Sequence, residues 1–465
     1  MPRRSTELLL IILCVFCASA LGQEVPREWI DPDTGHRVVR LSDEPGSASL
    51  YFHQNAYTPD GQKLLITTPT GLATINLKTH AVEKIVEGRV NVIIVGKKTG
   101  QVYYTKTVTN NNVRTTTVYA TDLNTKATRE IAKLPPATSV STVNADETLL
   151  AGTVDEKLAA AIKEGRPPAP PPAARGDAYP GKGRMMEDRL AERRPLQIVT
   201  VNIQTGEVKT LLRGTDWYNH LQFSPTDPTL LMFCHEGPWH KVDRTWTIRT
   251  DGTQLTQIHR RTMLMEIEGH EWFGADGKWI WYDLQTPRST VFWVAGYNVS
   301  NGERIWYNLQ RSEWSVHFNV SPDGTLFAGD GGGPNSVAAP GNGQWIYLFR
   351  PELVRDRTDG QLPAARELVQ PGVFKAEKLV NLSKHNYNLE PNVTFTPDMK
   401  WIVFRSNMFG PTHVFAVEIA LPKVRGSLGF LCGPLRISAL SALKGYFNAE
   451  DAEIRREPQR RVTSA

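Results

Sequence analysis

The stretch from Trp217 to Gly252, WYNHLQFSPTDPTLLMFCHEGPWHKVDRTWTIRTDG, contains one complete β-unit and decides the fold. A short apolar strand ends at Phe223, a Ser-Pro-Thr-Asp-Pro turn follows, and two more strands flank a polar loop. Proline and aspartate supply turn geometry, whereas alternating apolar residues supply the buried faces of strands. Three histidines, His220, His235 and His240, lie near the strand ends, where neutral imidazole can bind a metal ion or move a proton.

The same unit recurs along the chain as an aromatic or apolar residue, a Ser/Thr-Pro-Asp-Gly-like turn and a hydrophobic strand. The clear copies start at Tyr57, Val143, Phe223, Phe273, Val320 and Phe395, and a degenerate copy lies near Val95–Tyr104. Seven units of four short strands, most of them roughly 50 residues apart, are typical of β-propellers. We therefore predict an all-β fold, a seven-bladed β-propeller.

Residues 1–22 resemble a secretory signal peptide, because Arg3 and Arg4 precede a short apolar run and several small residues. An uncleaved anchor is the alternative, and no other segment is apolar enough to span a membrane. We therefore expect a periplasmic or secreted protein. Cys234 and Cys432 remain after cleavage, either as buried thiols or as one disulfide.

The propeller is predicted to be one domain over residues 23–445, followed by a charged tail over residues 446–465. A proline-rich insert at about residues 156–194 is predicted to form a loop or an ordered arm over one face. It cannot lie in the interior of a sheet, because proline donates no backbone hydrogen bond. No amphipathic helix is expected to interrupt the strands. The net charge of +5 is small and spread out, which argues against nucleic acid and suits a small anionic ligand.

The first strand of each propeller blade faces the axis, so equivalent positions on these strands should form a ring. Counting back three residues from the residue before each turn gives Gln54, Val140, His220, His270, His317 and Asn392, with Asn91 as a rough seventh. Three of the six clear positions are histidine, although the chain has only eleven histidines. The second strands return to the same face with further polar residues, namely His235, Glu236, Asp283, Asp330 and Arg405. Such convergence is typical of divalent-cation sites. The alternative is that these polar side chains only fill the channel and hydrogen-bond to each other and to water.

The blocks HLQFSPTDPTLLMFCHEGPWHKVDRTW, GHEWFGADGKWIWYD, SPDGTLFAGDGGG and FTPDMKWIVFRSNM resemble the oligogalacturonate lyase family. The resemblance covers most of residues 30–420 and implies a seven-bladed enzyme that cuts pectic uronides by β-elimination with a divalent metal, typically Mn²⁺. It implies that His220 is the catalytic base and that His270 is a metal ligand. It also implies that the arginine that this family has before the preceding strand falls on Arg194, with Arg193 as the other candidate.

One motif departs from the family pattern. The family's Gln-x-x-His-x-His cluster falls on Tyr387, Glu390 and Asn392, so the implied metal site would be richer in oxygen.

From these residues we hypothesise a mechanism in which His220 removes the C5 proton and Arg194 binds the substrate carboxylate. The metal ligands would be His270 with Glu390 and Asn392, or His270 with His235 and His317. The further candidates for substrate binding are His235, Arg193, Gln54, Arg405 and Tyr387.

Two other functions stay open from the sequence. One is a lyase or hydrolase for another acidic oligosaccharide on the same scaffold. The other is a non-catalytic periplasmic binding propeller, since the fold alone does not decide function. The histidine-rich ring favours an enzyme, because a purely structural channel does not need ligand-type residues.

Overall fold

The computed structural model describes residues 25–110, 113–165, 183–336, 338–339, 341–355 and 368–420. The predicted signal peptide, the proline-rich part of the insert, Cys432 and the predicted tail lie outside these ranges. Within them, Cys234 is a buried free thiol. No described helix is long and apolar enough to cross a membrane.

Four sheets in the first half of the described chain have the same order, in which each strand pairs antiparallel with the next. The first two are β3 (Ala48–Ser49), β4 (Lys63–Thr68), β5 (Gly71–Asn76) and β6 (Val82–Glu87), and then β7 (Asn91–Val95), β8 (Gln101–Asn110), β9 (Val113–Asp122) and β10 (Thr128–Lys133). The next two are β11 (Thr138–Val143), β12 (Leu149–Asp155), β13 (Leu196–Asn202) and β14 (Val208–Gly214), and then β15 (Trp217–Phe223), β16 (Leu230–Glu236), β17 (Thr245–Arg249) and β18 (Thr256–Gln257).

The second half repeats this order twice within one eight-stranded sheet. Its two sets are β19 (Ile267–Phe273), β20 (Trp279–Gln285), β21 (Phe292–Asn298) and β22 (Arg304–Leu309), and β23 (Phe318–Val320), β24 (Phe327–Gly329), β25 (Trp345–Leu353) and β26 (Val369–Asn381). A short 3₁₀ helix, η2 (Arg311–Glu313), connects them. The outer strands β22 and β26 pair in parallel, which joins two successive sets at their rims.

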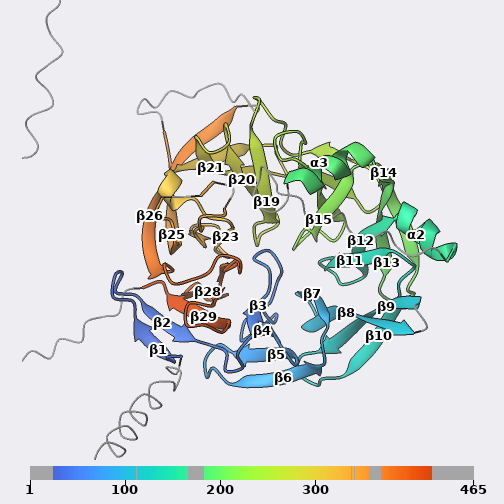
Figure 1. The fold of residues 1–465 in the computed structure, drawn as a ribbon, viewed down its shortest axis with the longest axis horizontal. Helices are drawn as coiled ribbons and strands as arrows, with labels where there is room; N and C mark the ends of the chain where they lie inside the picture. Colours follow the sequence, from blue (N-terminus) through green and yellow to red (C-terminus); the bar gives the residue numbers. More distant parts are fainter. Residues whose placement is uncertain are drawn as a thin grey trace, which may run out of the picture. The chain divides into compact units, whose positions relative to one another are not determined.

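The last sheet closes the ring with strands from both ends of the domain. It contains β27 (Thr394–Phe395), β28 (Trp401–Ser406) and β29 (His413–Glu418), followed by β2 (Arg37–Arg40) and β1 (Glu28–Ile30). Strand β2 pairs with β29 in the register Val38↔Val417, so the N-terminal strand completes the last blade. The sets follow one another around a common axis, with first strands inside and fourth strands at the rim (Figure 1). The prediction of a β-propeller is confirmed.

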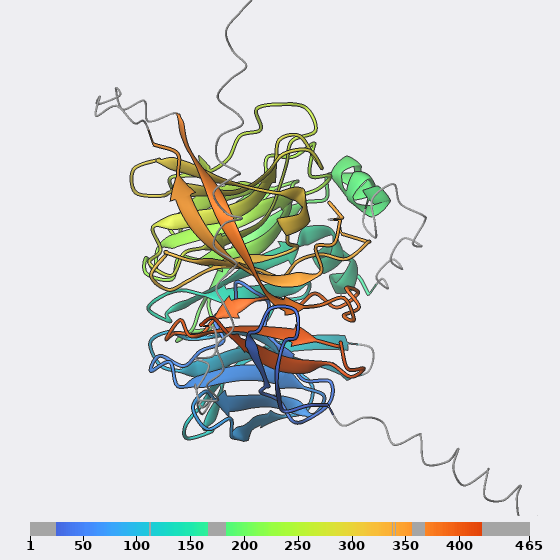
Figure 2. The same ribbon diagram turned by 90° about the vertical axis from the view of Figure 1, so that its left-hand side faces the viewer.

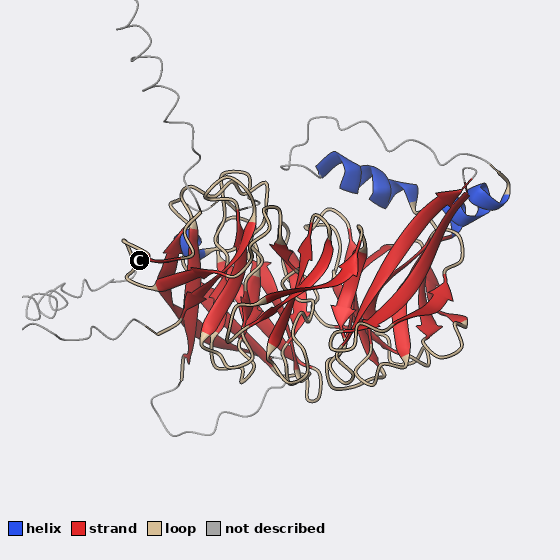
Figure 3. Cartoon of the chain, turned by 90° about the horizontal axis from the view of Figure 1, so that it is seen from below, coloured by secondary structure: helices blue, strands red, loops and turns tan. Residues whose placement is uncertain are grey.

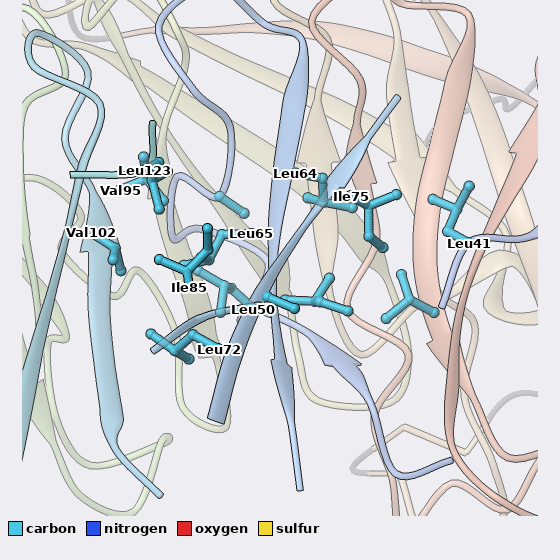
Figure 4. Packing of buried hydrophobic residues seen from close by; sticks show 14 of the residues in the cluster. Leu41, Leu50, Leu64, Leu65, Leu72, Ile75, Ile85, Val95, Val102 and Leu123 are labelled. Carbon is cyan, nitrogen blue, oxygen red and sulfur yellow. The ribbon is translucent and has the colours of Figure 1, made fainter. Parts of the chain in front are cut away.

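The hydrophobic core lies between neighbouring blades rather than at the axis. One cluster joins Leu64 and Ile75 of one blade, Val95 and Val102 of the next, and Leu41 beside the closing strand (Figure 4). All five side chains are buried. Successive side chains of a strand point to opposite faces of the sheet, and the consecutive residues Leu64, Leu65 and Ile66 of β4 are all fully buried, so both faces of this blade are covered.

The insert between β12 and β13 differs from the prediction of a helix-free arm. It contains α2 (Glu156–Lys163) and α3 (Gly183–Glu192), both on one face of the ring (Figure 3). The Asp155 carboxylate accepts a hydrogen bond from the Leu158 N–H and caps α2, which continues through the good helix formers Leu-Ala-Ala-Ala. Figure 2 shows how one helix stands out from the strands.

Candidate active site

A cavity of about 370 Å³ opens on the face that carries α3, since Met186 of that helix contributes to its wall. The inner strands β15 and β19 supply His220 and His270, and the second strands β16 and β20 supply Glu236 and Asp283. The first two strands of neighbouring blades therefore build the site together, as the count of repeat positions predicted.

A second cavity of about 480 Å³ lies at the opposite end of the axis, among the Pro-containing turns. Its amide side chains are already bonded to the backbone: Gln54 donates to Ile93 O at 2.8 Å, and Gln222 donates to Glu271 O at 2.7 Å. Although this cavity is larger, its polar groups connect neighbouring inner strands. We therefore place the candidate active site in the smaller cavity.

Local backbone geometry aims the two inner-strand histidines. His220 and His270 have φ values of 49° and 46°, and each lies where the register between the first and second strand shifts. A bulge with one residue in the left-handed region changes the direction of its side chain relative to the pleat. The same device in two neighbouring blades places both imidazoles in the cavity wall.

His270 and His317 form a pair, with ring centroids 4.7 Å apart. His270 Nδ1 lies 2.8 Å from Asp283 Oδ1, and His317 Nδ1 lies 2.8 Å from Asp330 Oδ2. Burial by itself lowers the pKa of His270, but the Asp283 carboxylate outweighs it and the pKa is raised. The pKa of His317 is lowered well below its ordinary value by burial and by the nearby His270. In both residues the carboxylate fixes the orientation of the ring through Nδ1. His317 Nε2 contacts Tyr51 Oη at 3.2 Å.

His220 lies beside a buried charge network. Its Nε2 is 3.9 Å from Glu236 Oε2, and Arg244 NH1 donates to Glu236 Oε1 at 2.7 Å. Arg244 NH2 also lies 3.5 Å from Glu271 Oε2. Burial acts to raise the pKa of Glu271, but Arg244 lowers it to about 2, so this carboxylate is ionised. Burial lowers the pKa of His220, so the ring is neutral near pH 7.

The segment Tyr51–Gln54 crosses the axis between the two cavities, because Tyr51 lines one of them and Phe52 lines the other. Its backbone is held by amide side chains of the last two blades. Asn392 Oδ1 accepts from Phe52 N–H at 3.1 Å, and Asn319 Nδ2 donates to Phe52 O at 3.1 Å. Tyr51 Oη then lies 3.2 Å from His317 Nε2.

Replacing Asn392 by glycine should lower the free energy of unfolding by about 1–3 kcal/mol, because Phe52 N–H loses its buried acceptor. Glycine tolerates the φ of 56° at this position, so the change tests the side chain alone. Chemical denaturation measures the effect, with exposed Asn388→Gly as the control. Equal stability of the two variants would contradict this structural role.

Four of the predicted site residues line the cavity: His220, His270, Glu390 and Tyr387. His317 lies directly behind them and is fully buried. Arg405 supports the wall, because its Nε donates to Glu390 O at 2.8 Å. Asn392 is buried, and its amide group is fully used by Phe52 N–H and Glu390 O.

The other predicted residues lie elsewhere. Gln54 contributes to the turn-side cavity. His235 stacks on Trp246 at 4.9 Å and is not among the residues of the cavity wall. Arg194 pairs with Asp155 and Glu192, both at 2.9 Å, and Arg193 pairs with Asp216 at 2.8 Å. These arginines belong to the insert rather than to the cavity wall.

Sequence reasoning missed Tyr51, His53, Arg244 and Glu271. Tyr51 and His53 lie between strands, where counting along the repeats does not reach; their signal was the aromatic and imidazole run Tyr-Phe-His before a turn. His53 is 6.3 Å from His220 between ring centroids, and burial lowers its pKa to about 3. Arg244 precedes the third strand of its blade, which the ring argument did not consider.

Comparison with known proteins identifies the family of this chain. The family model described as oligogalacturonate lyase matches residues 192–423. An oligogalacturonate lyase of Dickeya dadantii is 24% identical over 409 residues, covering 84% of this chain and 95% of the relative. An oligogalacturonide lyase of Pectobacterium atrosepticum is 24% identical over 422 residues, covering 86% and 98%. This chain belongs to the oligogalacturonate lyase family.

Solved structures of oligogalacturonate lyases share the fold. One in complex with manganese matches with a TM-score of 0.65 and 21% identity, covering 86% of this chain and 98% of that one. Another, from Vibrio parahaemolyticus, also matches with a TM-score of 0.65 and 21% identity, covering 84% and 96%. The predicted family resemblance is therefore confirmed, and the arrangement of blades is the one on which these lyases are built.

Proposed function

We propose that this protein is an oligogalacturonate lyase that cleaves short pectic oligouronides by β-elimination. The observation that carries the proposal is the convergence of His220, His270 and Glu390 on one cavity in a chain of this family. The cavity combines a neutral imidazole with ionised carboxylates of the protein. This arrangement suits removal of a proton from the substrate carbon next to the uronate carboxylate.

His220 is the proposed base. It is neutral near pH 7 because burial disfavours its charged form, so it can accept the C5 proton of a uronate. The imidazolium that results is stabilised by Glu236 and Glu271, whose charges act to raise the pKa of His220. Arg244 holds these two carboxylates in place. The bond to the leaving oxygen at C4 then breaks as the C4–C5 double bond forms, and the leaving oxygen takes up a proton from water.

The residues present fit a divalent metal in part. His270 and His317 have Nδ1 bonded to aspartate, which is the usual support of a metal-binding imidazole, and Glu390 Oε2 lies 3.7 Å from His317 Nε2. Asn392 does not fit, because both atoms of its amide are occupied. Among the described residues, no three His, Cys, Asp or Glu side chains already form a metal cage.

We therefore infer that His270, His317 and Glu390 would hold the ion, Mn²⁺ being the first candidate. When bound, such an ion neutralises the uronate carboxylate and the charge that develops on it.

Removing bound metal by dialysis against a chelator should lower the rate of unsaturated-product formation by about 100-fold or more, and Mn²⁺ should restore it. Ultraviolet absorbance of the conjugated product measures the rate with digalacturonate and trigalacturonate. Metal analysis provides a second readout: His270→Ala should lower the manganese content, whereas the control His80→Asn, whose histidine lines neither cavity, should not.

Other outcomes separate the alternatives. Release of reducing ends without new absorbance would indicate a hydrolase, and tight binding without any turnover would indicate a binding protein. Full activity after complete removal of metal would contradict the metal assignment.

A further inference from the structure

The cavity wall carries more negative than positive charge. Four carboxyl groups, those of Glu236, Glu268, Asp283 and Glu390, belong to the described wall, although burial raises the pKa of Glu268 to about 7 and leaves it only partly ionised near neutral pH. Arg244 is the one arginine or lysine of the described wall. Arg244 is almost fully buried and already engaged with Glu236 and Glu271. An oligouronide has more than one carboxylate, so beyond the one that the proposed ion neutralises, its binding is favoured by a cationic side chain at the rim.

Two arginines of the insert are unsuited to this role because they are neutralised locally. Arg194 donates to Asp155 and Glu192, and Arg193 donates to Asp216. To bind a substrate, either guanidinium would have to exchange an existing carboxylate partner for the new one, which lowers the net gain.

Arg189 of α3 is in a different environment. Its guanidinium lies over the ring of Trp217 at 4.1 Å, and its Nε is buried without a hydrogen-bond partner among the described atoms. No carboxylate in the described chain forms an ion pair with it within 4.0 Å. Trp217 is the first residue of β15, the strand that carries His220, so the stacking fixes the guanidinium relative to the base.

The position of Arg189 on its helix directs it towards the cavity. Met186 lies one turn earlier on the same face of α3 and is part of the cavity wall. Burial and the neighbouring Arg194 lower the pKa of Arg189, whereas the carboxylates of Asp155, Glu192 and Glu236 act in the opposite direction. Arg189 itself is not part of the described wall, but it lies next to it, one turn after Met186 and over Trp217 at the start of the strand that carries His220.

We propose that Arg189, held on Trp217 by the inserted helix α3, binds a carboxylate of the oligouronide and takes the place predicted for Arg194. This inference rests on the proposed lyase function, because it is the substrate's uronate groups that the guanidinium recognises. A planar guanidinium binds a carboxylate through two parallel hydrogen bonds, and stacking on an aromatic ring leaves its edge free to do so.

The test is binding of digalacturonate by calorimetry in a His220→Asn background, which prevents turnover. Adding Arg189→Gln should weaken binding about 10–100-fold, since a charge-assisted pair is lost. The fully methyl-esterified disaccharide, which has no carboxylate, should bind equally well with and without Arg189. The control is Arg184→Gln on the same helix, about 140° away around its axis, which should leave both affinities unchanged.

Unchanged affinity for digalacturonate after Arg189→Gln would overturn the proposal. So would an equal loss for the acid and the ester, because it would show that Arg189 acts only by packing on Trp217. Failure of the lyase function is seen separately, as the absence of unsaturated product from the protein with His220 intact. If digalacturonate does not bind even with Arg189 present, both proposals fall.

Discussion

Replacing His220 by asparagine should lower kcat for unsaturated-product formation by about 10²–10⁴-fold, which is the usual contribution of a positioned base. Asparagine tolerates the left-handed backbone at this position, where φ is 49°, so the loss should not come from backbone strain. The measurement is the initial rate of absorbance increase with digalacturonate at saturating concentration. His80→Asn, which also replaces a histidine of positive φ but outside both cavities, should retain the full rate.

The pH dependence of kcat/KM offers a second check on the base. A base works only when deprotonated, and burial lowers the pKa of His220 below its ordinary value of 6.5. We therefore expect kcat/KM to persist as the pH falls through 6.5 and to be lost only at lower pH. Loss of activity already above pH 6.5, or an undiminished rate in His220→Asn, would remove His220 from the mechanism.

Replacing Arg244 by methionine should lower the free energy of unfolding by about 3–5 kcal/mol, the usual cost of breaking a buried ion pair from one side. Arg244 is 2% exposed, and its loss leaves Glu236 and Glu271 buried without their counterion. The pKa of Glu271, now about 2, should rise, because Arg244 is what offsets its burial. Denaturant-induced unfolding followed by circular dichroism measures the change.

The matched control is Arg350→Met, which removes an ion pair of similar length at the surface. Arg350 NH1 lies 2.6 Å from Glu377 Oε2, but the two side chains are 50% and 32% exposed, so we expect a cost of at most about 1 kcal/mol. Adding Glu271→Gln to Arg244→Met should recover part of the stability. Similar costs for the two arginine replacements would show that the buried network does not stabilise the fold.

The repeat pattern predicted the fold and half of the candidate site. Turn residues such as Ser-Pro-Asp-Gly mark where each first strand ends, and a strand has a fixed rise per residue. A position counted from the turn therefore corresponds to a depth along the axis, which is why His220, His270 and His317 come together. The same count also found Asn392, but not that its amide binds the backbone of Phe52 instead of remaining free.

The residues that the sequence did not predict lie where the repeat does not determine position. Tyr51 belongs to a segment that crosses the axis, and its place depends on amide groups of Asn319 and Asn392 more than 260 residues away. Arg189 lies in an insertion whose docking on Trp217 is a tertiary contact. Arg194 was predicted to bind the substrate carboxylate, yet it pairs with two carboxylates and is not among the residues of the cavity wall.

The sequence by itself determined the propeller, its family and the histidines of the inner strands, because period and turn chemistry are local and repeat in every blade. Only the tertiary structure decided which polar groups are already engaged and which remain available to a ligand. The physical reason is that hydrogen bonds and ion pairs between distant segments, such as those of Asn392 and Arg244, depend on how blades pack and leave no periodic trace in the chain.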